Sequence, residues 1–120
     1  MLDTAAALNG FYSSFGYPAY VVNHVPEEVE PPYITYSAID PEWKGPAAHY
    51  AEVWTRSDSA ETAMRIADRI KQAVQPAARL VCDGGYVVLR PDNPFIQMTP
   101  TDDPVIKRMY INMQINCYHL

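Results

Sequence analysis

The sequence predicts an α+β fold in which a mostly antiparallel sheet has two helices packed on one face. Two segments place apolar residues at helical spacing, whereas several others alternate in polarity or are rich in Val, Ile and Tyr. The predicted strands mostly follow one another along the chain, which favours antiparallel pairing. The expected order of elements is α-β-β-β-α-β-β-(β)-β, within a single domain that covers residues 1–120.

The first predicted helix spans about residues 3–15. Its start is rich in alanine, and Leu8, Tyr12 and Phe15 lie at helical spacing. Gly16 follows, and glycine readily adopts the left-handed conformation that ends many helices. We therefore expect a short helix with one apolar face.

Three strands are expected next, over residues 19–25, 33–39 and about 49–56. The acidic, proline-rich segment 26–32 separates the first two, and we interpret it as a solvated loop. Segment 40–46 contains two prolines and a glycine, so it predicts a loop between the second and third strands. Those two strands are expected to form a long hairpin.

The second helix is predicted from about residue 60 to residue 74. Its apolar residues recur at helical spacing, while charged and amide side chains cover the opposite side. Asp58 and Glu61 are spaced as in a capping box, and Pro76 stops the helix.

The last part of the chain predicts strands at residues 79–82 and 86–90 and a short strand at 95–99. The first two are joined by Asp83-Gly84-Gly85, which indicates a tight hairpin turn because glycine accepts positive φ. Asp102 and Asp103 then precede the final strand.

The final strand, Val105 to Tyr118, alternates between two faces over its whole length. Apart from Lys107, one face is apolar: Val105, Met109, Ile111, Met113, Ile115 and Cys117. The other face is mostly polar: Ile106, Arg108, Tyr110, Asn112, Gln114, Asn116 and Tyr118. Amide and phenol groups can be solvated, and they also suit contact with another protein.

The sequence contains no motif that indicates catalysis or a metal site. His24, His49 and His119 lie in three separate segments, and no CxxC or HExxH motif occurs. Cys82 and Cys117 stand in apolar runs, which favours buried thiols, and a disulfide between them stays open. No cofactor or metal is expected. A small hydrolase would instead predict a pocket that holds two or more of the histidines or acids with a nucleophile nearby, and His24, His49 and an acid in one cleft would favour it over a structural role.

The charge balance disfavours binding to nucleic acid. Nine basic and fourteen acidic residues give a net charge of −5, and the basic residues are scattered. No apolar stretch approaches the length of a membrane span, and the N-terminus lacks the pattern of a signal peptide. We therefore expect a soluble product of the cytoplasm that makes no contact with a membrane.

Trp43 is a candidate contact residue in the loop between the second and third strands. It lies between Glu42 and Lys44 in a segment bounded by prolines. A tryptophan in such a loop either folds back onto the protein or serves as an anchor for a partner. Both interpretations stay open.

The order of elements resembles that of the small tail-terminator, or tail-completion, proteins of long-tailed bacteriophages. The resemblance lies in residues 31–36 (Pro-Pro-Tyr-Ile-Thr-Tyr), in residues 53–58 (Val-Trp-Thr-Arg-Ser-Asp) leading into the second helix, and in Asp102-Asp103 before residues 107–112. It covers nearly the whole chain. None of these segments is catalytic, so the ordering carries the resemblance.

The resemblance implies a structural role in joining a phage or prophage head to its tail. Such proteins form a ring, usually a hexamer, on the end of the tail tube and present a surface to the head connector. It implies no enzymatic activity. The implied partners are copies of the chain itself, the tail tube protein and the head connector or stopper protein, with a monomer possible before assembly. The implied location is the host bacterial cytoplasm during assembly and then the neck of the virion.

The candidate interface residues come from strand faces and from the loop. They are Trp43, Lys44, Arg108, Tyr110, Asn112, Gln114, Asn116 and Tyr118. The alternatives to tail termination are a neck or stopper subunit, an interaction module of a secretion apparatus, and a small hydrolase with a dispersed site.

Overall fold

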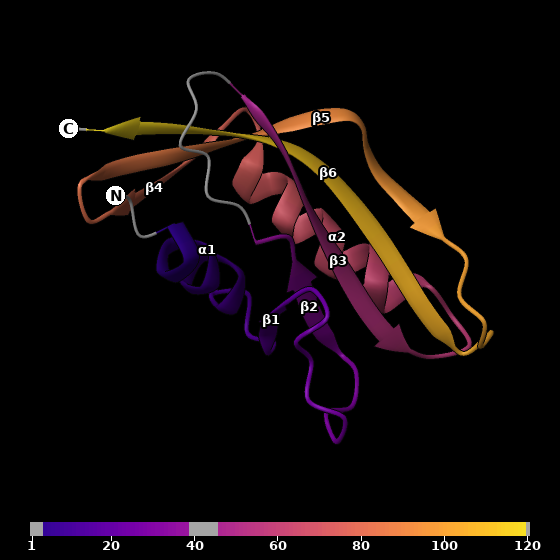
Figure 1. The fold of residues 1–120 in the computed structure, drawn as a ribbon. Helices are drawn as coiled ribbons and strands as arrows, with labels where there is room; N and C mark the ends of the chain where they lie inside the picture. The colour runs from indigo at the N-terminus through magenta and orange to yellow at the C-terminus, as the bar shows by residue number, and fades with distance from the viewer. Residues whose placement is uncertain (1–3, 39–45, 120) are drawn as a thin grey trace.

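The computed structural model describes residues 4–38 and 46–119 of the chain. Its elements are α1 (Thr4–Ser13), β1 (Ala19–Val21), β2 (Tyr33–Tyr36), β3 (Ala47–Arg56), α2 (Glu61–Val74), β4 (Ala78–Cys82), β5 (Gly85–Thr99) and β6 (Ile106–His119). Figure 1 shows the two helices against one curled sheet.

The strands of the described residues form one six-stranded sheet in the order β1-β2-β3-β6-β5-β4. The pair β1–β2 is parallel, and the other neighbouring pairs are antiparallel. β6 lies in the middle of the sheet and pairs along most of its length with β3 and β5. The predicted α+β class with a mostly antiparallel sheet is thus confirmed.

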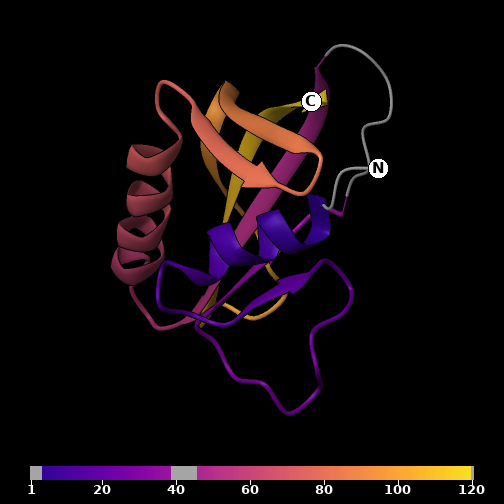
Figure 2. The ribbon, with the colours of Figure 1, turned by 90° about the vertical axis from the view of Figure 1, so that its left-hand side faces the viewer.

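Both helices pack against the same face of the sheet, which curls around them. α2 lies across β3, β6 and β5, and α1 contacts β1 and β4, the two edge strands. Figure 2 shows α1 between the β4–β5 hairpin and β1. The curl of the sheet brings its edges toward α1, so the helices and the concave face of the sheet enclose the core.

The alternation of β6 divides this core from the opposite face. Met109, Ile111, Met113 and Ile115 of β6 are each at most 6% exposed and belong to the core cluster. The core cluster also includes Ala63, Ile66, Ala67, Ile70 and Val74 of α2 and Leu8 and Tyr12 of α1. The predicted apolar face of the last strand is therefore confirmed from Met109 to Cys117 as the side that meets the helices, whereas Val105 lies in the turn before β6.

The predicted capping box at the start of α2 is wrong. The N-cap position is Ala60, which makes no side-chain capping bond. The backbone N–H of Glu61 instead donates to Oγ of Ser59 at 3.1 Å, and Glu61 pairs with Arg65. Asp58 lies two positions before the N-cap because the helix begins at Glu61.

Several predicted strand boundaries also differ. β2 ends at Tyr36, before the predicted end at residue 39. β1 ends at Val21 rather than at residue 25, because Asn23 adopts a positive φ of 68° and the N–H of His24 closes a turn on the carbonyl of Val21. The predicted strands 86–90 and 95–99 are parts of one strand, β5. Its register against β6 shifts between Pro91 and Ile96, since Pro91 and Pro94 have no N–H to donate.

The two faces of β6 predict opposite effects of neighbouring substitutions. Ile115→Ala should lower the free energy of unfolding by about 2–5 kcal/mol, because it opens a cavity at a fully buried position. Gln114→Ala, one residue away on the opposite face, should change it by no more than about 0.5 kcal/mol. Urea unfolding followed by circular dichroism measures both. Equal losses in the two variants would contradict the assigned faces.

Candidate interaction face of the sheet

The face of the sheet opposite α1 and α2 carries the sequence-predicted contact residues of β6. We call it the helix-free face: Arg108, Tyr110, Asn112, Gln114, Asn116 and Tyr118 with their cross-strand partners in β3 and β5. None of these six side chains meets α2, because α2 packs on the other face. Trp43 and Lys44 lie outside the described residues, so the structure does not place them.

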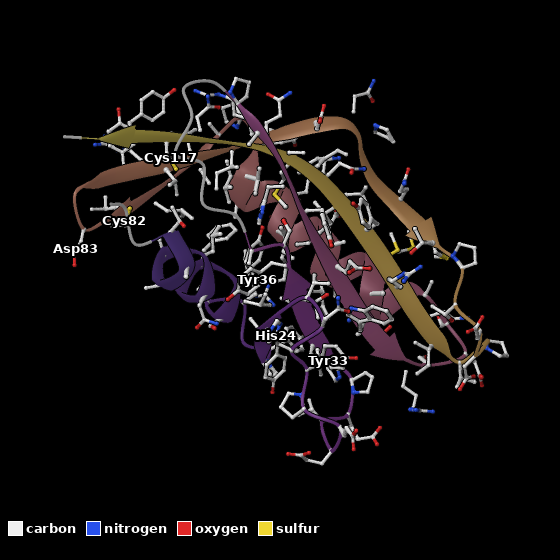
Figure 3. All side chains as sticks on the ribbon, viewed as in Figure 1. His24, Tyr33, Tyr36, Cys82, Asp83 and Cys117 are labelled. Atoms are coloured by element: carbon white, nitrogen blue, oxygen red, sulfur yellow. The ribbon has the colours of Figure 1, made fainter. Side chains whose placement is uncertain are left out.

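Aromatic pairs connect neighbouring strands on the helix-free face. Tyr110 stacks on Tyr50 of β3, with ring centroids 5.1 Å apart. Tyr118 stacks on Tyr86 of β5, with ring centroids 4.9 Å apart. Figure 3 shows that side chains cover this outer side of the sheet as well as the core side. Such cross-strand pairs stabilise a sheet and at the same time present ring edges and hydroxyls to solvent.

The amides of β6 are partly engaged within the chain. Asn112 donates from Nδ2 to the carbonyl of Pro94 at 2.9 Å, which holds the shifted part of β5. Asn116 accepts a bond of 3.2 Å from Arg90. Gln114 is half-buried between these two positions. The face is therefore ordered, and its amides retain further donors and acceptors for a partner.

A hollow of about 450 Å³ opens at the β2 end of the helix-free face. Its lining residues are Val22, Asn23, Val25, Tyr33, Thr35, Glu52, Trp54 and Arg108. Trp54 donates from Nε1 to Oγ1 of Thr35 at 2.9 Å, and the guanidinium of Arg108 lies 5.2 Å from the ring centroid of Trp54. The hollow thus has an aromatic wall that carries a cation.

Glu52 is the acidic residue among those that line this hollow. It is buried, Oγ1 of Thr35 donates to its carboxylate at 3.4 Å, and Nε of Arg108 lies 3.6 Å from Oε2. Burial raises the pKa of Tyr33, and the carboxylates of Glu52 and Glu30 raise it further. Burial likewise raises the pKa of Tyr110, with smaller contributions from Tyr50 and Glu52. Both phenols therefore stay protonated and can act as hydrogen-bond donors.

A second polar cluster, which no sequence motif indicates, lies inside the core. The N–H of Tyr50 donates to Oγ of Ser37, and Oγ of Ser37 lies 2.8 Å from Nδ1 of His49. Nε2 of His49 lies 2.8 Å from the hydroxyl of Tyr12, and this hydroxyl donates to Sδ of Met113. A neutral imidazole protonated at Nε2 satisfies every contact in this chain of bonds.

This cluster has the properties of a structural element. Burial lowers the pKa of His49 to about 4, so the imidazole is neutral near pH 7. Its contacts join α1 to β3 and β6 and to the segment that follows β2. His49 stands on the same side of β3 as Ala51 and Val53, so strict alternation along the strand would have revealed its burial.

His24 and His49, which together with an acid in one cleft would favour a hydrolase, lie apart. His24 is exposed in the turn after β1, where Nδ1 contacts the carbonyl of Val22, whereas His49 is buried between α1 and the sheet. The two imidazoles therefore do not share a cleft. Sequence spacing alone left this possibility open.

The remaining candidates are a metal site, a membrane-spanning helix and the two cysteines. In the part of the chain that the structure describes, no three His, Cys, Asp or Glu side chains are grouped to hold a metal ion. No helix among the described residues is long and apolar enough to cross a membrane. Cys82 and Cys117, labelled in Figure 3, are both half-buried and form no disulfide.

The buried imidazole predicts a loss of stability in acid. The pKa of His49 is about 4 in the fold and about 6.5 in an unfolded chain, so only the unfolded chain binds a proton between these values. Proton binding by His49 in the unfolded chain should therefore lower the free energy of unfolding by about 2 kcal/mol as pH drops from 7 to 4.5. Urea unfolding of wild type and His49→Gln at both pH values measures it. Equal pH dependence in the two proteins would contradict the assignment.

The pair Arg108–Glu52 predicts a coupling between its two partners. Arg108→Met should lower the free energy of unfolding by about 1–3 kcal/mol, because the buried carboxylate keeps only the long contact from Thr35. Adding Glu52→Gln should recover part of this loss, since an amide costs less to bury than an unpaired carboxylate. A double-mutant cycle by urea unfolding tests this. Strictly additive effects would show that the pair is not coupled.

Comparison with known proteins relates the fold to a viral particle. Neither a protein-family model nor a curated protein matches the sequence. A chain in the solved structure titled "Virion of native gene transfer agent (GTA) particle" matches with a TM-score of 0.65 and 16% identity, over 96% of this chain and 97% of that chain. At this identity the match shows that the two chains share a fold across nearly their full lengths.

Proposed function

We propose that this chain is a structural protein of a tailed-phage-type particle, which caps the tail tube as a ring and joins it to the head connector. The observation that carries the proposal is the shared fold. Nearly the whole chain aligns with nearly the whole of a chain in a gene transfer agent virion, so the likeness is not a local motif. The resemblance in the order of elements supplies the more specific role.

The chemistry of the helix-free face supports a role in assembly. The face presents tyrosines, amides and an arginine, and tyrosine and arginine are enriched where proteins bind one another. Amides and phenols also keep such a face hydrated before binding. The same surface therefore suits a protein that stays soluble when free and is covered after assembly.

Ring formation requires two different surfaces on each copy. A heterologous contact joins one patch to a different patch on the next copy, and it closes into a ring when the rotation permits. The sheet has a broad helix-free face and ends in two unlike edges, β1 and β4. The proposed partners are further copies of the chain, the tail tube protein and the head connector.

Particles produced without this chain should have abnormal tails. We expect overlong tubes or tubes without heads, because nothing would stop tube growth or present a surface to the connector. Negative-stain electron microscopy of lysates with and without the gene measures tail length and the fraction of joined particles. Tails of normal length joined to heads in its absence would contradict the proposed function.

Complementation with matched variants refines this experiment. Gln114→Lys places a charge on the helix-free face, whereas Gln72→Lys places the same charge on the exposed side of α2. Gln114→Lys should fail to restore joined particles, and Gln72→Lys should restore them. Both proteins should have the thermal stability of wild type.

A further inference from the structure

The β4 end of the helix-free face forms a compact patch of arginine and tyrosine. We call Arg79, Val81, Tyr86, Arg90 and Tyr118 the arginine–tyrosine patch, because their register places them on one side of β4, β5 and β6. The guanidinium of Arg79 lies 4.0 Å from the ring centroid of Tyr86, which stacks on Tyr118. Val81 is 78% exposed and Tyr118 38% exposed. Exposed apolar and aromatic groups beside arginine are typical of a binding surface.

The arginines of this patch have no carboxylate partner among the described residues. The ion pairs found in that part of the chain involve Arg56, Arg65 and Arg108. Arg90 donates instead to the neutral amide of Asn116. In a chain with a net charge of −5, two exposed guanidinium groups that form no ion pair within the described residues suit an acidic partner.

The chain itself presents an acidic segment of matching charge. The N–H of Val29 donates to the carbonyl of Pro26 at 3.1 Å, which closes a turn with Glu27 and Glu28 at its centre. Both glutamates are exposed, and neither forms an ion pair within the residues that the structure describes. Two carboxylates on a closed turn thus face solvent, as two guanidinium groups do on the patch.

The two surfaces lie at opposite ends of the sheet. The acidic turn connects β1 to β2, whereas the patch lies on β4, β5 and the end of β6, across the strand order. In Figure 1 the loop between β1 and β2 projects downward, away from β4. A contact between turn and patch in neighbouring copies would therefore be heterologous, and each copy could continue it to the next.

We infer that the acidic turn of one copy, with Glu27 and Glu28, docks on the arginine–tyrosine patch of the next copy. The carboxylates pair with Arg79 and Arg90, while Val81 and Tyr118 are covered at the centre of the contact. That such contacts close into a ring rests on the proposed function. The patch is thus bound by a second copy of the chain.

Charge reversal and exchange test this contact in the purified full-length protein. Sedimentation velocity over a range of protein concentrations should show self-association of wild type that weakens as NaCl rises. The patch variant Arg79→Glu/Arg90→Glu and the turn variant Glu27→Arg/Glu28→Arg should each associate at least tenfold more weakly. An equimolar mixture of the two should recover association, because the native turn of the first meets the native patch of the second.

The control variant Arg65→Glu/Arg69→Glu changes the same charge on the exposed side of α2 and should associate as wild type does. Thermal unfolding of every variant verifies that it is folded. The inference is overturned if wild type is monomeric at all concentrations, if the reversed variants still associate, or if the mixture does not recover. It is also overturned if the patch variant still self-associates as wild type does and loses only its binding to the tail tube protein.

These outcomes are distinguishable from failure of the proposed function. If the reversed variants still associate, the proposed contact between turn and patch is excluded, but the role in tail capping is not affected. Normal particles in the absence of the gene would exclude the role in tail capping. Self-association that weakens with salt and is recovered in the mixture of reversed variants would still support the contact between copies.

Discussion

The alternation of β6 between an apolar and a polar face determines both the core and the exposed surface of the sheet. Its odd-numbered residues from Met109 to Ile115 form the centre of the core, and its even-numbered residues form the middle of the helix-free face. A slip of one residue in pairing would exchange the two sets, which would bury amides and expose four large apolar side chains. Core packing therefore fixes the orientation of every candidate contact residue on this strand.

Curvature of the sheet determines which surface is left for partners. α1 contacts both edge strands, and α2 covers the concave face, so the core side is closed by the chain itself. The buried cluster of Tyr12, Ser37 and His49 strengthens this closure, because it joins α1 to the sheet through hydrogen bonds that no water needs to complete. The convex, helix-free face then remains as the broad ordered surface with unused donors and acceptors.

Local patterns were sufficient to predict most elements of this fold. The alternation of residues 105–118 predicted both faces of β6, and the apolar spacing of residues 60–74 predicted α2. The parallel pairing of β1 with β2 could not be predicted, because it depends on how α1 positions β1 rather than on adjacent residues. The continuity of β5 does not follow from the sequence, because prolines usually end a strand, whereas β5 continues past Pro91 and Pro94 with a shift in register. The arginine–tyrosine patch cannot be predicted from the sequence, because its residues come from three strands and are brought together only by strand pairing.

The place of this chain in an assembled particle can be observed by cryo-electron microscopy of purified particles. The reconstruction should show a ring of copies of this chain at the head-proximal end of the tail tube. In that ring the helix-free face should be covered by protein rather than by solvent. A reconstruction with the chain at another place in the particle, or with its helix-free face open to solvent, would rule out the proposed capping role.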